Sequence, residues 1–299
     1  MKAKHVIIYL LLVIVTSSCI RDEAPNAEAD ILSCRLPGIT MTTSPIINNN
    51  SVTLFVTPGT NISALAPEFT LTSGATITPA SGTERNFNSP QEYQVTAADG
   101  IWKKTYAISV IDTELATIYN FEDTISGKKY YIFVERENDK VIMEWASGNA
   151  GYAMTGVAKT ADDYPTFQIA NGKNGKCLSL VTRSTGFFGG LVGMPIAAGN
   201  LFIGSFDVNN AMSNPLQATK FGLPFRHVPT YLAGYYKYKA GDQFTEGGKP
   251  VEGKRDICDI YAIMYETSVS VPTLDGTNAF TSPNLVSMAR IKDAKETDE

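Results

Sequence analysis

The residues with the clearest capacity for chemistry lie in the stretch 226–242, RHVPTYLAGYYKYKAGD, which holds four tyrosines among basic side chains. If this stretch forms a strand, Tyr236 and Tyr238 share one face, because successive side chains point to opposite sides. That face is apolar enough to pack in a core. Tyr235 and Lys237 share the wet face, where a ring can stack on the C–H face of a sugar and a lysine can bond a hydroxyl. We therefore predict Tyr235 and Lys237 as glycan-binding candidates.

A second candidate is the stretch 143–152, MEWASGNAGY, in which Trp145 precedes a Ser-Gly-Asn turn. A tryptophan carries a large apolar area and one hydrogen-bond donor. At the end of a strand, before a turn, such a side chain is expected either to pack or to bind a ligand. One interpretation is that Trp145 covers the end of the hydrophobic core. The other is that its ring is a stacking platform for a sugar, with Asn149 and Tyr152 as hydrogen-bond partners.

Catalysis on a glycosidic bond would need two carboxyl groups, about 5–5.5 Å apart in retaining enzymes and ~6.5–9.5 Å apart in inverting ones. Asp256 and Glu266 fall on one face of a predicted strand, but roughly 33 Å separates them along it, so they are not a pair. The sequence has no GxSxG, phosphate-loop or HExxH pattern. Enzymatic activity stays open, with binding favoured. The candidate carboxylates are Glu122, Asp123, Glu144, Asp256, Asp259 and Glu266.

Metal and cofactor chemistry has little support in the sequence. Cys34, Cys177 and Cys258 are widely spaced and form no CxxC pattern, so a zinc site is not expected. We expect each to be a small buried side chain, or two of them to form one disulfide. His227 is expected in a loop. The stretch 120–124, NFEDT, could help to hold a structural calcium, although a solvated strand end is favoured. No other cofactor is expected.

The N-terminus has the order of a secretory signal peptide over residues 1–18, with a basic start, an apolar run at 6–15 and a small polar trio before Cys19. The apolar run is too short to cross a bilayer ~30 Å thick as a helix. Cys19 at the cleavage point predicts lipid attachment; an ordinary secreted protein with a free or paired cysteine is the alternative. Residues 19–29 favour a flexible, lipidated tether, because they lack large apolar side chains after Ile20.

The elements that follow are strands. Residues 30–111 alternate apolar and polar side chains in runs such as SVTLFVTP, EYQVTA and TYAISVI. Asp99-Gly100 between the last two runs predicts a hairpin turn, with Trp102 packed at one end of the fold. Short strands at this spacing predict an Ig-like β-sandwich. The segments LAPEFTLTSGATITPASGT and YQVTAADGIWKKTYAISV resemble the Ig-like N-terminal modules of Gram-negative surface lipoproteins, which implies a spacer role.

After a linker at 112–116, residues 117–299 show longer strands such as KKYYIFVERE, KVIMEWAS and DICDIYAIMYE. This pattern of long strands predicts a larger jelly-roll β-sandwich. The blocks NFED, MEWASGNAGYA, DYPTFQIANGKNGKCLSLVT and TKFGLPFRHVPTYLAGYYKYKAGD resemble the putative carbohydrate metabolism domain, PCMD, of bacterial outer-membrane lipoproteins. The resemblance implies a jelly roll that binds or acts on glycans. Domains that it resembles carry further strands after the segment VSMARIKDAKETDE, which here is a charged tail. Either this domain lacks its last strands, or its sheet closes differently.

The sequence as a whole predicts an all-β lipoprotein, lipid-anchored in the outer membrane and facing the cell exterior. The formal net charge is −5 and no run of lysine or arginine stands out, so nucleic acid is not an expected partner. The expected partners are a polysaccharide or oligosaccharide and, through the lipid anchor, a membrane. One alternative is a glycoside hydrolase or other carbohydrate-active enzyme with a carboxylate pair. Another is a structural or adhesion protein.

Overall fold

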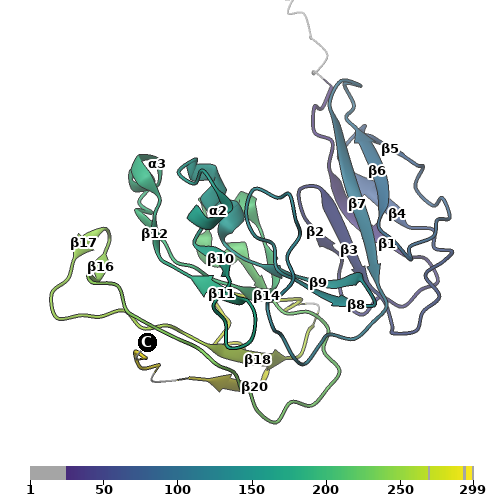
Figure 1. Ribbon diagram of the computed structural model, residues 1–299. Helices are drawn as coiled ribbons and strands as arrows, with labels where there is room; N and C mark the ends of the chain where they lie inside the picture. The colour runs from purple at the N-terminus through teal and green to yellow at the C-terminus, as the bar shows by residue number, and fades with distance from the viewer. Residues whose placement is uncertain (1–24, 269, 292–293, 298–299) are drawn as a thin grey trace, which may run out of the picture.

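The structure, a computed structural model, describes residues 25–268, 270–291 and 294–297. The predicted signal peptide at 1–18 and the predicted lipid-attachment residue Cys19 lie outside these residues. Figure 1 shows two β-rich regions, one formed by the N-terminal part of the chain and one by the rest of it. The expected all-β character is confirmed as a mostly β fold with a few short helices.

The N-terminal region consists of two sheets that share one hydrophobic core. A five-stranded sheet has the order β2-β3-β7-β6-β5, in which β3 and β7 are parallel, and a second sheet pairs β1 with β4. The alternating pattern places Leu54, Val95 and Ile108 in the core, where each is fully buried. The strands are β1 (Ile31–Arg35), β2 (Ile46–Ile47), β3 (Ser51–Phe55), β4 (Glu68–Leu71), β5 (Thr76–Thr78), β6 (Gln91–Thr96) and β7 (Lys103–Ile111).

The predicted hairpin between β6 and β7 is confirmed. Gly100 has a positive φ of 71°, which a residue with a side chain rarely adopts. The Oδ1 atom of Asp99 accepts hydrogen bonds from the backbone N–H groups of Ile101 and Trp102, at 2.8 and 3.2 Å. The prediction that Trp102 packs at the end of the fold is wrong: it is 63% exposed. The turn places the Trp102 ring beyond the last residues of the core.

The C-terminal region is built on a five-stranded antiparallel sheet of order β19-β15-β14-β9-β8. Four two-stranded pairs surround it: β10–β11, β12–β13, β16–β17 and β18–β20. The strands are β8 (Val134–Glu137), β9 (Lys140–Ala146), β10 (Thr166–Ile169), β11 (Cys177–Leu180), β12 (Arg183–Ser184), β13 (Ile196–Ala197), β14 (Phe202–Phe206), β15 (Thr219–Phe221), β16 (Thr245–Glu246), β17 (Lys249–Pro250), β18 (Tyr261–Tyr265), β19 (Leu274–Asp275) and β20 (Leu285–Arg290).

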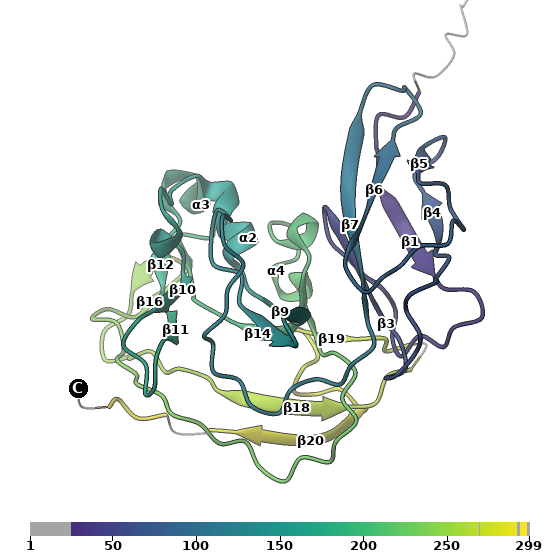
Figure 2. The same cartoon turned by 45° about the vertical axis from the view of Figure 1, so that its right-hand side comes forward.

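Short helices cover one side of this region. Figures 1 and 2 show α2 and α3 on one side of β10, β11 and β14, whereas the β18–β20 pair lies on the other side. The helices are α2 (Asn149–Tyr152), α3 (Gly186–Leu191) and α4 (Pro215–Ala218), with single 3-10 turns η1 (Ala153–Thr155), η2 (Ala161–Asp163) and η3 (Val208–Asn210).

The stretch 226–242 differs from its prediction, because it forms no strand. It is an extended segment between β15 and β16, crossing the lower part of Figure 1. Alternating side chains favour an extended backbone, but a strand also needs a neighbour to receive its hydrogen bonds. Here Tyr238 exchanges hydrogen bonds with Thr297, from the N–H of Tyr238 to Oγ1 and from the N–H of Thr297 to the Tyr238 carbonyl. The N–H of Ala240 donates to a side chain, at Oε1 of Glu296, so it forms no ladder. The prediction of a buried face is wrong for Tyr236, which is 38% exposed.

The segment VSMARIKDAKETDE, expected as a charged tail, begins within a strand, β20. Its first residues belong to β20, which pairs antiparallel with β18 and sets Met288 opposite Ile263. Val286 is nevertheless exposed. In the part of the chain that the structure describes, this pair has no third strand.

Candidate functional site

The segment 120–123, NFED, is held in an unusual backbone conformation. Phe121 has a φ of 57°, in the left-handed region that bulky residues seldom occupy. The side-chain amide of Gln168, from β10, donates to the carbonyls of Phe121 and Glu122 at 2.7 and 2.9 Å. On its other side the chain runs antiparallel to β8, since the N–H of Val134 donates to the Asp123 carbonyl at 3.1 Å. Strain held in place by such contacts is often found at functional sites.

Trp145 packs directly against this segment. It comes from β9, is half-buried, and its ring centre lies 5.4 Å from that of Phe121 and 5.0 Å from that of Tyr119. Its Nε1–H donates to Oε1 of Glu135 at 2.8 Å. Trp145 therefore belongs to an aromatic cluster that remains partly open to water, and its only donor is already engaged.

Glu135, on β8, is the most unusual carboxyl group beside this cluster. Burial raises its pKa, the hydrogen bond from Trp145 lowers it, and the charge of Asp123 raises it again. The pKa of Tyr119 rises to about 12, through burial and then through the charge of Glu135. The charge of Asp123 thus acts on Glu135, and the raised pKa means that Glu135 keeps its proton to a higher pH than an ordinary glutamic acid does.

Glu144, another predicted carboxylate, points to the opposite face of β9 from Trp145 because adjacent strand residues alternate. It is exposed to solvent, yet the protein around it desolvates the carboxyl group and raises its pKa, an effect that the charge of Lys128 opposes. Glu144 and the Trp145 cluster thus lie on different faces of one strand.

Asn149 and Tyr152 are buried in α2, at 1% and 4% exposure. The Asn149 side chain donates to the Thr166 carbonyl at 2.7 Å and accepts from the Thr166 N–H at 3.1 Å. The hydroxyl of Tyr152 donates to the carbonyl of Ser184 at 2.8 Å. Both side chains tie α2 to neighbouring strands, which positions the chain that follows Trp145, and their polar atoms bond within the protein.

Tyr235 lies on the surface, 83% exposed. The Nζ atom of Lys173, from the turn between β10 and β11, lies 5.0 Å from the centre of its ring, within the range of a cation–π interaction. Lys237 is also exposed and close to this turn, since its charge lowers the pKa of Cys177, which burial and the charge of Glu122 raise. Tyr235 and Lys237 therefore meet the β10–β11 turn, a contact that sequence reasoning missed.

The two predicted aromatic candidates are connected through the segment 120–123. Phe121 contacts the Trp145 ring, and the next residue, Glu122, accepts a hydrogen bond on Oε1 from the backbone N–H of Lys176 at 3.0 Å. Gly175 allows this approach, because a Cβ atom there would lie 2.2 Å from the same oxygen. Trp145 and the β10–β11 turn that carries Lys173 are thus held by one short stretch of chain.

We call the group Tyr235, Lys237, Lys173, Glu122 and Trp145 the aromatic–lysine surface. Sequence reasoning named all of these residues except Lys173, and it also missed Glu135. The hairpin of β8 and β9 could have revealed Glu135. Its two-residue turn, Asn138-Asp139, sets Glu137 opposite Lys140, and after a shift in register Glu135 lies opposite Met143, two positions before Trp145 on β9.

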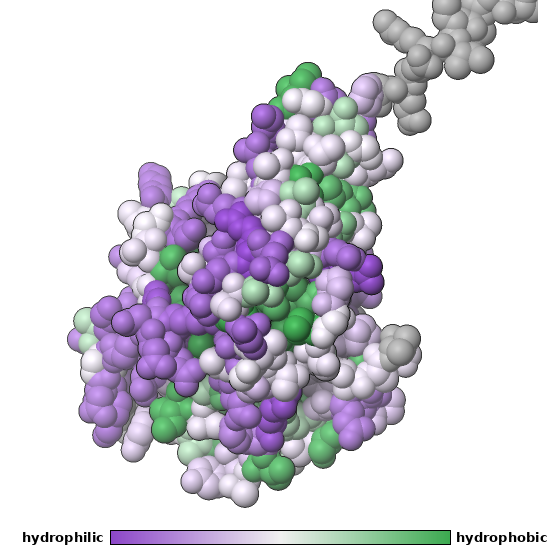
Figure 3. Space-filling model, turned by 90° about the vertical axis from the view of Figure 1, so that its right-hand side faces the viewer, coloured by the Kyte–Doolittle hydropathy of each residue, from purple (hydrophilic) through white to green (hydrophobic). Residues whose placement is uncertain are grey.

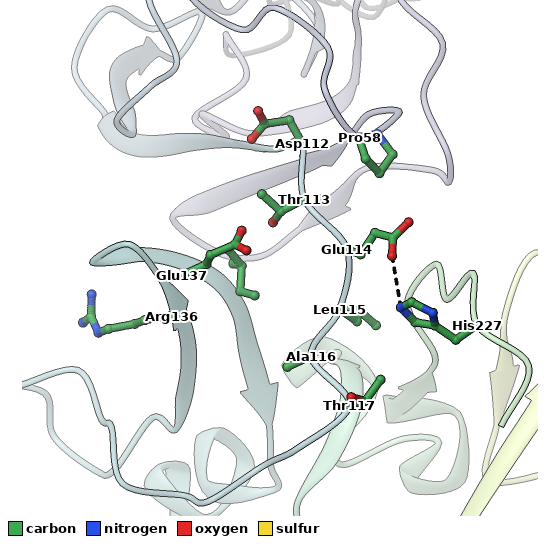
Figure 4. A pocket seen from close by; sticks show the side chains of 11 residues that line it. Pro58, Asp112, Thr113, Glu114, Leu115, Ala116, Thr117, Arg136, Glu137 and His227 are labelled. Atoms are coloured by element: carbon green, nitrogen blue, oxygen red, sulfur yellow. Dashed lines mark ion pairs between the residues drawn. The ribbon is translucent and has the colours of Figure 1, made fainter. Parts of the chain in front are cut away.

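A hollow with a volume of about 730 Å³ lies elsewhere, between the two regions. Figure 4 shows the linker crossing it, with Glu114 facing His227. Two of its acidic groups have partners: Glu114 Oε2 lies 3.0 Å from His227 Nε2, and Asp112 Oδ1 lies 2.8 Å from Lys140 Nζ. We assign this hollow to the joint between the regions, because these pairs hold the linker to the C-terminal region.

The described residues contain no group of three His, Cys, Asp or Glu side chains that could hold a metal ion. Cys34, Cys177 and Cys258 are free thiols, and burial raises the pKa of Cys34 to about 12. Within the same described ranges, no helix has the length and apolarity needed to cross a membrane.

The fold is mostly β, and the exposed Tyr235 ring lies beside Lys173. Residues 120–299 match the family described as PCMD, putative carbohydrate metabolism domain, and the chain belongs to this family. Residues 31–110 match the family described as SGBP, N-terminal. The two resemblances predicted from sequence blocks are therefore confirmed.

The solved structures that are similar to this chain include two putative glycoside hydrolases. One, from Bacteroides thetaiotaomicron, is described as a putative glycoside hydrolase; it shares 85% sequence identity with a TM-score of 0.88, over 93% of this chain and 82% of that one. The other, from Bacteroides vulgatus and described in the same words, shares 48% identity with a TM-score of 0.56, over 60% of this chain and 74% of that one. No curated protein matches the chain.

Proposed function

We propose that this protein is a lipid-anchored surface protein of the outer membrane that binds glycans through residues 117–299. In this proposal Cys19 carries the lipid, residues 30–111 form an Ig-like stalk, and residues 117–299 fold as a jelly roll. The family of the C-terminal region supports the carbohydrate partner. The N-terminal family supports a place at the surface, since SGBP designates surface glycan-binding proteins.

The observation that carries the proposal is the exposed ring of Tyr235 with Lys173 against it. Its neighbour Lys173 fixes the ring from one side at 5.0 Å, which leaves the other face for a ligand. A sugar ring stacked there would remove apolar area of both partners from water. The Lys173 and Lys237 ammonium groups can donate to sugar hydroxyl or carboxylate oxygens. Lys173 at the ring and the exposed Lys237 two residues after Tyr235 favour a glycan with acidic sugars.

Affinity electrophoresis of the mature chain tests this proposal, with neutral and uronic-acid-containing polysaccharides cast in native gels. The proposal expects retardation in at least one acidic polysaccharide, measured against a non-binding reference protein. Migration equal to the reference in every polysaccharide would contradict it.

A second candidate function is hydrolysis of a glycosidic bond, favoured by the raised pKa of Glu135 and the charge of Asp123 that acts on it. Glu135 has the raised pKa that a general acid needs, and Asp123 is a neighbouring carboxylate. The related Bacteroides thetaiotaomicron protein is described as a putative glycoside hydrolase. Release of reducing sugar from a bound polysaccharide, lost in Glu135→Gln, would establish this activity. Retardation without any release by the wild-type chain would exclude it for that glycan.

A further inference from the structure

The free end of the N-terminal region carries two large apolar side chains at its tip. Ile101 and Trp102, in the turn between β6 and β7, are 77% and 63% exposed. The turn is well ordered, because Asp99 accepts hydrogen bonds from both backbone N–H groups and the Ala97 N–H donates to the Trp102 carbonyl at 2.9 Å. Figure 3 shows apolar surface at this extremity. Folding thus holds an isoleucine and a tryptophan in water at a fixed point, which marks an interaction site.

The chain enters the fold at this same end. Asp30 forms an ion pair with Lys104, which follows the turn at the start of β7. Close packing joins the turn to the segment after β4, since a Cβ atom on Gly74 would lie 2.7 Å from the Cβ of Ala98. Figure 1 shows the β6–β7 turn at the end of the region where the described chain begins, opposite the joint with the C-terminal region.

We propose that Ile101 and Trp102 dock into the interfacial layer of the membrane that carries the lipid anchor. This inference rests on the proposed attachment of lipid at Cys19. The first described residue, Pro25, follows Cys19 by six positions, and such a stretch reaches about 20 Å at most. The anchor therefore keeps this end of the protein near the bilayer surface.

The chemistry of the tip fits a lipid headgroup layer. Tryptophan is enriched at the membrane–water interface, where its ring meets both apolar chains and water. The isoleucine beside it adds apolar area, and the exposed ammonium group of Lys103 can contact lipid phosphates. A lipid tether alone leaves the protein free to tilt. The second contact sets the long axis of the N-terminal region and keeps the aromatic–lysine surface away from the membrane.

Fluorescence quenching by brominated lipid tests this contact. The chain from Ile20 onward, with an N-terminal polyhistidine tag in place of lipidated Cys19, is tethered to phosphatidylcholine vesicles that contain a nickel-chelating lipid. The chain has two tryptophans, so Trp145→Phe leaves Trp102 as the sole indole. We expect about a twofold loss of Trp102 emission in vesicles of brominated phosphatidylcholine, relative to unbrominated vesicles with the same nickel content.

Two further variants separate the tip from other apolar surface. Ile101→Ser is expected to reduce the quenching, whereas Phe187→Ser, which changes an 88% exposed ring in α3, is expected to leave it unchanged. If Trp145→Phe does not fold, the wild-type chain is compared with Trp102→Phe, and the difference reports Trp102. Emission that does not depend on bromination in the tethered protein would overturn the proposal. If Trp102 emission instead responds to a soluble polysaccharide, the tip binds a glycan and the membrane assignment is wrong.

The result does not depend on the proposed function, because the tag replaces the lipid and the vesicles hold no glycan. A protein that fails in affinity electrophoresis can still dock at the vesicle, and a protein that is retarded can fail to dock.

Discussion

The Nζ atom of Lys173 lies 5.0 Å from the centre of the Tyr235 ring, although the two residues are far apart in the sequence. This contact joins the β10–β11 turn to the extended stretch 226–242, which no strand partner holds. The contact places the ammonium group of Lys173 against an exposed ring. The glycan-binding proposal depends on this contact.

The lysines beside Tyr235 should make binding sensitive to salt. Lys173→Gln and Lys237→Gln are each expected to weaken retardation by an acidic polysaccharide and to reduce its dependence on ionic strength, because screening acts on exposed charges. Lys249→Gln, in the exposed hairpin of β16 and β17, removes the same charge elsewhere and serves as the control. Equal losses in all three variants would indicate a general charge effect and no local site.

Gln168 should be important for stability, because it satisfies two carbonyl groups at the strained turn of Phe121. Gln168→Leu leaves both acceptors without this donor, so we expect the free energy of unfolding to fall by about 2 kcal/mol in urea titrations. Gln217→Leu, on the exposed face of α4, makes the same chemical change without a lost contact and is expected to have little effect. If the free energy of unfolding falls no more in Gln168→Leu than in Gln217→Leu, the Gln168 hydrogen bonds are not needed to hold the turn.

Gly175 has a φ of 75° and faces the carboxylate of Glu122. Gly175→Ala should cost about 1–2 kcal/mol for the left-handed backbone, and more for displacing Glu122. Gly253→Ala is a matched control, since Gly253 has the same φ of 75° but no atom within 4 Å of an added Cβ. The excess loss of stability in the first variant measures the contact with Glu122. Equal losses in the two variants would mean that the carboxylate moves away freely.

Glu135 should destabilise the fold as pH rises. Its pKa in the folded state is raised above the ordinary value of 4.5, so the folded state binds a proton more tightly than the unfolded chain does. The stability it contributes is complete below pH 4.5 and is lost as pH rises through the higher folded-state pKa. Glu135→Gln keeps an oxygen for the Trp145 N–H and cannot ionise.

Thermal unfolding of the two proteins between pH 4 and 8 checks this. The melting temperature of Glu135→Gln should match that of the wild type near pH 4 and exceed it near neutral pH. A variant that is less stable than the wild type near neutral pH would show that the ionised carboxylate is the favoured form.

The sequence predicted those parts of the structure whose signals are local. The β6–β7 hairpin follows from Asp99-Gly100, because the turn residues themselves supply the required conformation. The strand predicted within 226–242 did not form. Alternation is a property of the segment itself, whereas strand formation also needs a neighbouring strand to pair with. The contact between Tyr235 and Lys173 could not be predicted for the same reason: it joins residues whose nearness is decided by the packing of the β10–β11 turn. The exposure of Trp102 was missed because burial of a large ring was assumed where the core had already ended.

The most direct test of the account compares Tyr235→Ala with Tyr231→Ala in affinity electrophoresis against the polysaccharide that retards the wild-type chain. Both rings belong to the same extended stretch and are almost equally exposed, at 83% and 80%, but the cation–π contact with Lys173 is made by Tyr235. We expect Tyr235→Ala to weaken binding about tenfold, which corresponds to about 1.4 kcal/mol, and Tyr231→Ala to bind as the wild type does. Undiminished binding by Tyr235→Ala would contradict the proposal that this surface holds the glycan.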